Sequence, residues 1–313
     1  MIIDVHTYLW NRLDDLGENS AARVESALGD DASHVGGVHV DRAMAQVSRV
    51  VVLGAVSRQA GLEMSPRQTA EVVKHDPHRL IGFAGVDPLA GKPETQVDQV
   101  AQLQLHGVTI SPQAQGFHPT HSRAMRLYEQ CAQAGLPVVV LSCDAFTNER
   151  ALAFGSPMLF DEVASAFADL KLVIAGLGGP FTDQTFELLA KHENVYSDVS
   201  GIVERPWQLY HTLLAGHERN VLDKILFGSG YPFCTPERAI TNIYSINVFS
   251  QGTNLPSVPR QRLRAIVECD ALSKLGIGGR VGRGEVIDTS ETSAGDSGAT
   301  DHNQLDDVKA IPA

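Results

Sequence analysis

The chain has 313 residues, of which 43% are hydrophobic and 20% are charged, which is the composition of an ordinary globular protein. Its formal charge is −12 and it has no run rich in Lys and Arg, so a nucleic-acid-binding surface, which needs a basic patch, is not expected. There is no apolar run of about 18 residues and no signal-peptide pattern, so we expect a cytoplasmic protein without membrane contact.

The four cysteines indicate no structural metal site. They are widely spaced and contain no CxxC pair, which argues against a zinc ribbon. We expect free thiols in a reducing compartment. The residues are Cys131, Cys143, Cys234 and Cys269.

Eight short apolar runs follow one another along the chain, which is typical of buried parallel strands. They cover residues 2–6, 50–55, 80–86, 107–111, 137–142, 171–176, 194–198 and 224–228. The segments between them are mostly helical, and this alternation predicts right-handed crossovers and a parallel sheet. Eight such strands close a barrel, so we predict one (β/α)8 barrel of the TIM type.

Helical patterns occupy the segments between these strands. They cover residues 122–134, 157–170, 182–192, 235–249 and 259–275. In the first of them, apolar residues recur at helical spacing, and Gly135 with the following Pro137 marks its end. Ser156 is predicted to cap the second helix, with Pro157 at its first position.

Two segments depart from a minimal barrel. The first crossover, residues 7–48, is long and is expected to include a loop over the barrel mouth. Beyond residue 278, Gly, Ser, Thr and Asp dominate, and residues 281–313 hold seven acidic and two basic residues. Such a composition buries too little apolar surface to offset chain entropy. We therefore predict a barrel domain over residues 1–278 and a disordered or loosely packed acidic tail over residues 279–313.

Six segments carry a pattern of strand ends that is found together in one known family. They read MIIDVH (1–6), DPHRLIGFAGVDP (76–88), GLPVVV (135–140), DLKLVIAGLGG (169–179), NVYSDVSG (194–201) and ILFGSGYPF (225–233). In this order they resemble the amidohydrolase-related family, in the branch that includes aminocarboxymuconate-semialdehyde decarboxylase and 2-pyrone-4,6-dicarboxylate lactonase. The resemblance implies a TIM barrel with a site at the C-terminal ends of its strands.

The resemblance also implies a divalent metal at that site. The expected ligands are a His-x-His on strand one, a His closing strand five, often a His on strand six and an Asp after strand eight. Such a metal lowers the pKa of a bound water to about 7. The corresponding positions here hold His6, Tyr8, Leu141 (Ser142 if the register shifts by one), Gly176 and Gly230.

Only His6 in this set is a strong ligand, because neutral Tyr binds metal poorly and Leu and Gly do not bind it. On strand four the family often shows Gly-Val-Lys-x-His-Pro, whereas residues 107–112 read GVTISP and place Ser111 at the His position. We therefore expect no tightly bound metal and at most weak binding of zinc or a similar ion.

His6 and Asp198 are the candidate catalytic residues. His6 is a leftover ligand, a base in a metal-free pocket or a histidine hydrogen-bonded inside the barrel mouth. Asp198, near the end of strand seven, is a mouth carboxylate or a group that satisfies backbone amides. Asp4 precedes His6 by two and faces the same side of the strand. It either fixes the tautomer of the His6 ring or caps a backbone group.

Further polar residues follow the strands. His118 and His121 lie in the loop after strand four, where they contact a ligand, replace lost metal ligands or are simply solvated. Cys143 is a nucleophile beside a charged histidine or, as we favour, a buried structural thiol. Ser229 lies between two glycines but lacks the Gly-x-Ser-x-Gly spacing of a nucleophile elbow.

The leading hypothesis is a metal-free, catalytically degenerate barrel that binds a small ligand or a partner. The alternative is an active hydrolase or decarboxylase with a rebuilt or metal-independent site. A third hypothesis is a subunit that pairs with an active paralogue and supports it. A homo-oligomer is the alternative assembly and argues against this third hypothesis.

Overall fold

The computed structural model describes residues 1–36 and 38–281. Eight parallel strands form one sheet in the order β1-β2-β5-β6-β7-β8-β9-β10. Their bounds are Ile3–Thr7, Arg49–Leu53, Leu80–Gly85, Gly107–Ile110, Val138–Val140, Leu172–Ile174, Val195–Asp198 and Ile225–Leu226. Each strand lies inside a predicted apolar run or extends at most one residue beyond it. The prediction of eight parallel strands is confirmed. A short antiparallel hairpin, β3 (Ala55–Ser57) with β4 (Leu62–Met64), follows β2.

Backbone hydrogen bonds between β1 and the segment after β10 close the sheet into a barrel. The amide of Val5 donates to the carbonyl of Phe227 at 2.9 Å, and the amide of Tyr8 donates to the carbonyl of Tyr231 at 2.8 Å. In return, the amide of Gly230 donates to the carbonyl of His6 at 2.9 Å. The seam therefore joins the first and last strands at the point where His6 and Tyr8 leave β1.

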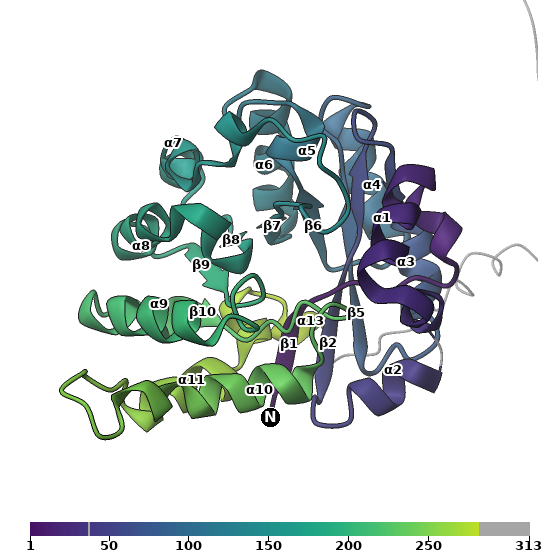
Figure 1. The fold of residues 1–313 in the computed structure, drawn as a ribbon. Coiled ribbons are helices and arrows are strands. Elements are labelled where there is room, and N and C mark those ends of the chain that lie inside the picture. Colours follow the sequence, from purple (N-terminus) through teal and green to yellow (C-terminus); the bar gives the residue numbers. More distant parts are fainter. Residues whose placement is uncertain (37, 282–313) are drawn as a thin grey trace, which may run out of the picture. The chain divides into compact units, whose positions relative to one another are not determined.

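Helices surround the strands, as Figure 1 shows. The α-helices are α1 (Glu18–Leu28), α2 (Val38–Ala43), α3 (Pro66–Val73), α4 (Pro93–Gln102), α5 (Pro112–Gln115), α6 (Ser122–Ala134), α7 (Asp161–Ala166), α8 (Thr182–Lys191), α9 (Pro206–Glu218), α10 (Pro236–Ser245), α11 (Arg260–Glu268), α12 (Ala271–Lys274) and α13 (Gly278–Val281). Short 3₁₀ helices are η1 (Leu13–Leu16), η2 (Gly29–His34), η3 (Leu152–Gly155), η4 (Pro157–Phe160), η5 (Ala175–Phe181), η6 (Leu222–Lys224) and η7 (Ile246–Ser250). None of the helices in residues 1–36 and 38–281 is long and apolar enough to cross a membrane.

The predicted helices over residues 122–134 and 182–192 correspond to α6 and α8. The predicted helix 157–170 begins as the 3₁₀ turn η4, and α7 ends it at Ala166. Ser156 stands at the N-cap position but makes no capping hydrogen bond, and its hydroxyl donates to Gln184 Oε1 at 2.7 Å. The Ser156 side chain therefore contacts α8 and not the first turn of the predicted helix.

The predicted final helix, residues 259–275, is two helices. Cys269 has an extended backbone with φ −67° and ψ 151°, which ends α11. The side chain of Asp270 then accepts a hydrogen bond from the Ser273 amide and begins α12. The Asp270 side chain, which binds a backbone amide, thus helps to divide a segment whose apolar periodicity predicts a single helix.

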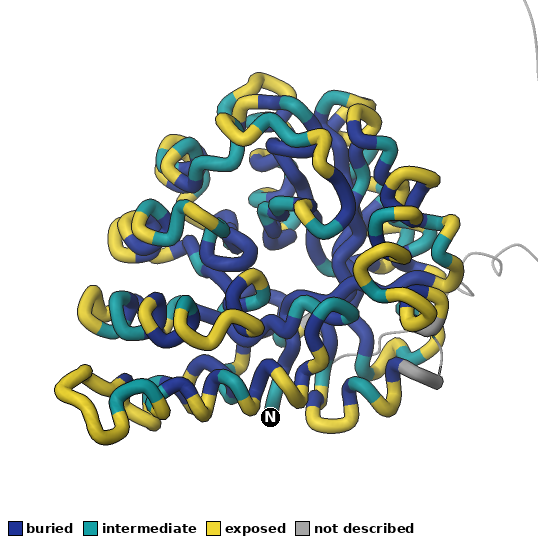
Figure 2. The backbone as a smooth tube through the Cα atoms, viewed as in Figure 1, coloured by how far each residue is buried: buried dark blue, intermediate teal, exposed yellow. Residues whose placement is uncertain are grey.

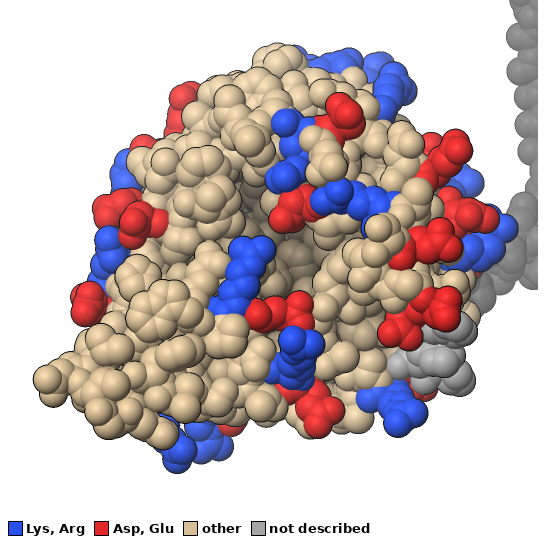
Figure 3. All heavy atoms as spheres, viewed as in Figure 1, with Lys and Arg blue, Asp and Glu red and all other residues tan. Residues whose placement is uncertain are grey.

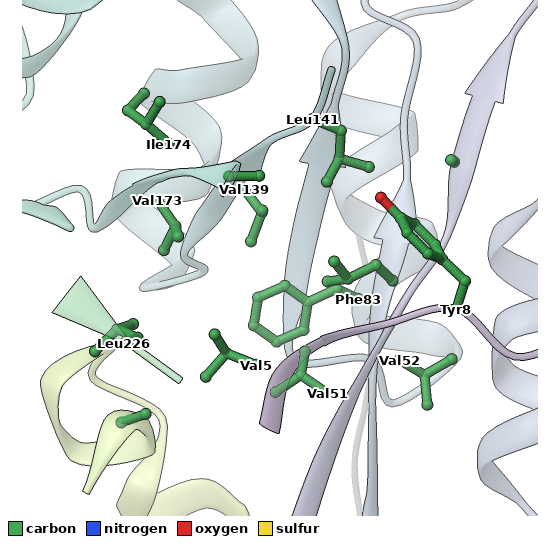
Figure 4. Packing of buried hydrophobic residues seen from close by; sticks show 14 of the residues in the cluster. Val5, Tyr8, Val51, Val52, Phe83, Val139, Leu141, Val173, Ile174 and Leu226 are labelled. Carbon is green, nitrogen blue, oxygen red and sulfur yellow. The ribbon is translucent and has the colours of Figure 1, made fainter. Parts of the chain in front are cut away.

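The strands are almost wholly buried, as the dark interior of Figure 2 shows. Side chains from different strands, among them Val5, Phe83 and Leu226, gather in the barrel interior in Figure 4. Gly107 on β6 makes room for one of them, since a Cβ there would lie 2.4 Å from the ring of Phe83. The core therefore depends on a small residue facing a large one.

The first crossover reaches the barrel mouth. The guanidinium of Arg23 on α1 donates two hydrogen bonds, at 3.0 and 3.2 Å, to the carbonyl of Asp144 in the loop after β7. The sequence also predicted a domain boundary at residue 278 and an acidic tail after it. From residue 282 onward, this prediction lies outside the described residues.

Candidate active site in the barrel mouth

A cavity of about 340 Å³ opens at the C-terminal ends of β1, β7, β8, β9 and β10. Figure 3 shows a hollow in this face, with acidic and basic side chains around it. The end of a barrel at which parallel strands terminate is where such folds carry their sites. The residues that line the cavity include His6, Tyr8, Ser142, Cys143, Asp144, Ala145, Ala175, Gly176, Ser200, Gly201, Ile202, Arg205, Gln208, Gly230 and Phe233.

His6 lies at the floor of this cavity and uses both ring nitrogens. Its Nδ1 is 3.1 Å from Asp198 Oδ2, and its Nε2 is 2.9 Å from the hydroxyl of Tyr8. The hydroxyl of Ser200 is also 3.1 Å from Nδ1. The ends of β1 and β9 thus place a connected polar cluster at the floor of the cavity in the barrel mouth.

Asp198 satisfies backbone amides, which is one of its two alternatives, and it also contacts the His6 ring. One oxygen, Oδ2, holds the His6 ring, and the other, Oδ1, accepts the amides of Gly176 at 3.2 Å and Ser200 at 2.9 Å. A carboxylate that accepts this many hydrogen bonds remains ionised. Because an ionised carboxylate cannot donate, Nδ1 of His6 carries a proton.

The charges of the pair shift both pKa values. Burial, the largest effect on His6, would lower its pKa, but the charge and hydrogen bond of Asp198, together with the charges of Asp4 and Asp144, raise it. Burial would raise the pKa of Asp198, but His6 and Ser200 together lower it. Burial, with the nearby groups Cys143, Asp144 and Asp198, raises the pKa of Tyr8 well above its usual value. Tyr8 is therefore a neutral phenol.

Asp4 supports the site without holding the ring. Its Oδ1 accepts the amide of His6 at 3.1 Å and the amide of Ser229 at 3.0 Å. Of the two alternatives for Asp4, the structure gives the backbone cap. Burial raises the pKa of Asp4 to about 6, although hydrogen bonds from Ser229 and His6 act in the opposite direction. Asp4 thus ties the end of β1 to the segment after β10.

Glycines allow the strand ends to approach one another. A Cβ on Gly228 would lie 2.8 Å from the Cβ of His6 and 3.1 Å from Asp198 Oδ1. Gly176, at φ +57°, packs against Gly201 so closely that a Cβ on either would lie 3.2 Å from the other's Cα. These positions need glycine for close approach as well as for backbone conformation.

The remaining predicted pocket residues of strands four, five and eight are divided. Ser142 and Gly230 line the cavity, and the Ser142 hydroxyl donates to Asp144 Oδ1 at 2.6 Å. Leu141 is buried behind the lining residues. Ser111 is buried and its hydroxyl accepts the amide of Ala114 at the start of α5.

The two loop histidines do not join the cluster. His118 is exposed, with its Nδ1 2.9 Å from the Thr120 hydroxyl. His121 caps α6, where its Nδ1 accepts the amide of Arg123 at 3.2 Å. Neither residue is among those that line the cavity, which differs from the prediction that both line the pocket. β6 and α5 carry their loop to the side of the mouth.

Two candidate nucleophiles have structural surroundings. Burial raises the pKa of the Cys143 thiol to about 12, which disfavours the reactive thiolate. The hydroxyl of Ser229 is buried and accepts the amide of Tyr231 at 3.0 Å. Both arrangements agree with the structural interpretation of these residues.

Sequence reasoning missed Ser200, Asp144, Arg205, Gln208 and Phe233, which line the cavity. A signal existed for Ser200, which follows Asp198 by two within the quoted seventh-strand motif. Arg205 and Gln208 stand at the start of α9, after β9, where barrel loops commonly carry site residues.

Among the residues that line the cavity, His6, Cys143 and Asp144 carry side chains that could contact a metal. A catalytic zinc site needs three protein ligands. In the part of the chain that the structure describes, no three His, Cys, Asp or Glu side chains converge to hold an ion. His6, the one strong donor on strand one, already has partners on both ring nitrogens.

The sequence matches the Amidohydrolase family over residues 3–258, and the chain belongs to this family. None of the curated proteins matches the sequence.

Solved structures share the fold at low identity. A probable 2-pyrone-4,6-dicarboxylic acid hydrolase from Acinetobacter baumannii aligns with a TM-score of 0.63 and 14% identity, over 88% of this chain and 99% of that chain. A 5-carboxyvanillate decarboxylase from Sphingomonas paucimobilis aligns with a TM-score of 0.61 and 13% identity, over the same shares. An amidohydrolase from Burkholderia multivorans, solved with bound zinc, aligns with a TM-score of 0.66 and 15% identity, again over 88% and 99%.

Proposed function

We propose that this amidohydrolase-family barrel works without a resident metal and binds a small organic ligand in the cavity at its mouth. The observation that carries the proposal is the state of His6, whose two ring nitrogens are held by Asp198 and Tyr8. A metal would have to displace one of these partners, and in the described part of the chain it would find no group of three His, Cys, Asp or Glu side chains. The zinc-bound neighbour from Burkholderia multivorans gives the contrasting case within the same fold.

The shape and lining of the cavity support a small ligand. Its volume of about 340 Å³ lies at the lower end of the range for ligand pockets. Apolar walls, including Ala175, Ile202 and Phe233, surround a polar floor. Such a mixture gives affinity through burial and orientation through a few hydrogen bonds.

A second candidate function is a metal-independent hydrolase or decarboxylase. The convergence of His6, Tyr8 and Asp198 at the cavity floor favours it, because a barrel that had lost all chemistry would not need a connected polar cluster there. The hydrolase and decarboxylase names among the fold neighbours favour the same reaction classes.

The test measures metal in untagged protein by elemental mass spectrometry and follows added zinc and manganese by calorimetry. We expect less than one-tenth of an ion per chain, on the order of contamination, and no binding tighter than about millimolar. About one tightly held ion per chain would overturn the proposal.

A rebuilt variant gives the matched control for that assay. Tyr8→His combined with Ser142→His returns imidazoles to two cavity-lining positions at which the resemblance implies ligands. This double variant is expected to bind zinc at least about tenfold more tightly than the wild-type protein. A thermal-shift screen of small organic acids and amides then tests the cavity itself: stabilisation of the wild-type protein is expected, and Ile202→Trp, which fills the cavity, should abolish it.

A further inference from the structure

A hydroxyl group lies on each nitrogen of the His6 ring, which itself lines the cavity. The Tyr8 hydroxyl covers Nε2 at 2.9 Å, while Asp198 and the Ser200 hydroxyl cover Nδ1 at 3.1 Å each. Tyr8 and Ser200 both line the cavity, whereas Asp198 lies behind the ring and is fully buried. A ligand on the cavity floor therefore meets a hydroxyl before it meets an imidazole nitrogen.

The two hydroxyls are not equivalent. The proton on Nδ1 is fixed by the carboxylate of Asp198, whose other oxygen accepts two backbone amides. Nε2 is therefore the nitrogen of neutral His6 that has a free lone pair, and the Tyr8 hydroxyl lies on it. The route for a proton between the ring and the cavity thus passes through Tyr8.

Packing holds the Tyr8 ring in place. It meets the ring of His6 edge-on, with centroids 5.1 Å apart and planes at 83°, and it meets Phe146 at 4.8 Å and 83°. Figure 4 shows the ring extending from the end of β1 towards the side of the barrel where Leu141 lies. A phenol held between two rings keeps its oxygen on Nε2 and at the cavity surface, which is the preorganisation that proton transfer needs.

We propose that Tyr8 relays a proton between His6 and a carbonyl ligand in the cavity, so that this barrel supports proton transfer to and from carbon without a metal. The inference rests on the proposed function, because it requires a small ligand in this cavity. In the step, the C–H bond beside the ligand carbonyl breaks and its proton bonds to the Tyr8 oxygen. The Tyr8 proton moves to Nε2 of His6, and the electron pair remains on the ligand as an enolate. The reverse step returns a proton to carbon.

The two transfers must be coupled. Burial and the charges of Asp144 and Asp198 disfavour a negative charge on Tyr8, so its oxygen must gain one proton as it loses the other. The resulting imidazolium of His6 is stabilised by Asp198 at 3.1 Å. Tyr8 thus ends each step as a neutral phenol.

The cavity lining carries both the carboxylate of Asp144 and the guanidinium of Arg205, and Arg205 is the group that can pair with an anionic ligand. Arg205, at the start of α9, uses one nitrogen to donate to Gln208 Oε1 at 3.3 Å. A guanidinium has five N–H donors, so further donors can pair with a carboxylate. The ligand class is therefore a small oxo carboxylate with an exchangeable C–H bond beside its carbonyl.

The experiment follows the exchange of C–H protons for deuterium in D₂O by NMR, with pyruvate, 2-oxobutanoate and acetoacetate as probes. Wild-type protein is expected to accelerate exchange of at least one probe above the buffer rate. Tyr8→Phe keeps the ring and its packing but removes the relay, and it should lower the protein-dependent rate about 100-fold or more. Tyr196→Phe, which removes a hydroxyl from β9 outside the cavity, should leave the rate unchanged.

A second variant and a binding measurement separate the possible outcomes. His6→Gln should also lose exchange, while saturation-transfer NMR should show that both variants still bind the probe. Exchange that is equally fast in Tyr8→Phe or His6→Gln overturns the relay. Binding to wild-type protein without exchange also overturns it but leaves the proposed binding function standing. The lack of both binding and exchange for all three probes counts against the relay and the ligand proposal together.

Discussion

At the scale of single residues, the barrel mouth distinguishes two buried carboxylates by what each one contacts. Asp198 contacts the His6 ring and accepts a hydrogen bond from it, whereas Asp4 accepts hydrogen bonds from two backbone amides. Burial penalises the charged form of both. Only Asp198 has a partner strong enough to lower its pKa, and Asp4 is left with a pKa of about 6.

Asp4 makes the stability of the barrel depend on pH. Its folded pKa is raised from 3.8 to about 6, so the folded state binds this proton more tightly than the unfolded chain. Asp4 therefore costs stability progressively as the pH rises from about 4 to about 6, by about 3 kcal/mol in total. Asp4→Asn keeps an acceptor oxygen for the two amides but does not titrate.

Urea unfolding at pH 4, 5 and 7 checks this expectation. The free energy of unfolding of Asp4→Asn, relative to wild type, should increase by up to about 3 kcal/mol between pH 4 and pH 7. Asp98→Asn, on the exposed side of α4, is the control and should show a constant difference. If the difference in free energy of unfolding between Asp4→Asn and wild type were the same at every pH, the raised pKa of Asp4 would be wrong.

At the scale of elements, a small residue on one strand faces a large residue on the neighbouring strand. Gly107 begins β6 opposite Phe83 of β5, and these two residues are register partners. The ring of Phe83 occupies the volume that a side chain at position 107 would need. A β-strand would normally be weakened by glycine, so the packing of the large ring compensates for the loss.

Gly107→Ala is expected to destabilise the barrel by about 1–3 kcal/mol, because a close-packed core cannot accept a methyl group without strain. Phe83→Leu, introduced together with Gly107→Ala, frees space and should recover part of that loss. Chemical denaturation of the two single variants and the double variant measures the coupling between the positions. Additive effects of the two substitutions would show that the ring and position 107 do not compete for space.

At the scale of the whole molecule, the barrel closes where its site is built. The same stretch of β1 that carries His6 and Tyr8 accepts and donates the hydrogen bonds of the seam with residues 227–231. Closing the sheet brings together residues that are 192 positions apart, His6 and Asp198, and 194 positions apart, His6 and Ser200. The contacts that close the barrel thus also assemble the site.

Gly228 tests this coupling. Gly228→Ala would place a methyl group between β10 and β1, against His6 and Asp198, and should cost about 1–3 kcal/mol of stability. It should also change the imidazole NMR signals of His6, because the ring must move relative to Asp198. Gly279→Ala, where a Cβ has open space, is the control for a glycine substitution. Loss of stability with unchanged His6 signals would show that seam and site are independent.

The sequence by itself determined the barrel and the candidates at its mouth. Strand runs, their order and the polar residues that end them are local features, and burial of parallel strands makes the runs apolar. The fold, the floor residues His6 and Tyr8, and the position of Asp198 at the end of β9 could therefore be predicted. The same reasoning found Ser142, Gly176 and Gly230 at the mouth, because strand ends converge there.

Only the tertiary structure decided which groups meet. In the sequence, Asp4 was the candidate for holding the His6 ring, but the placement of β9 beside β10 brings Asp198 to the ring. The path of the chain after β6 took His118 and His121 out of the site, and α9 brought Arg205 into it. The physical reason is that hydrogen-bond partners are fixed to within a few tenths of an ångström by strand register and loop path, which depend on contacts between distant segments and not on local periodicity.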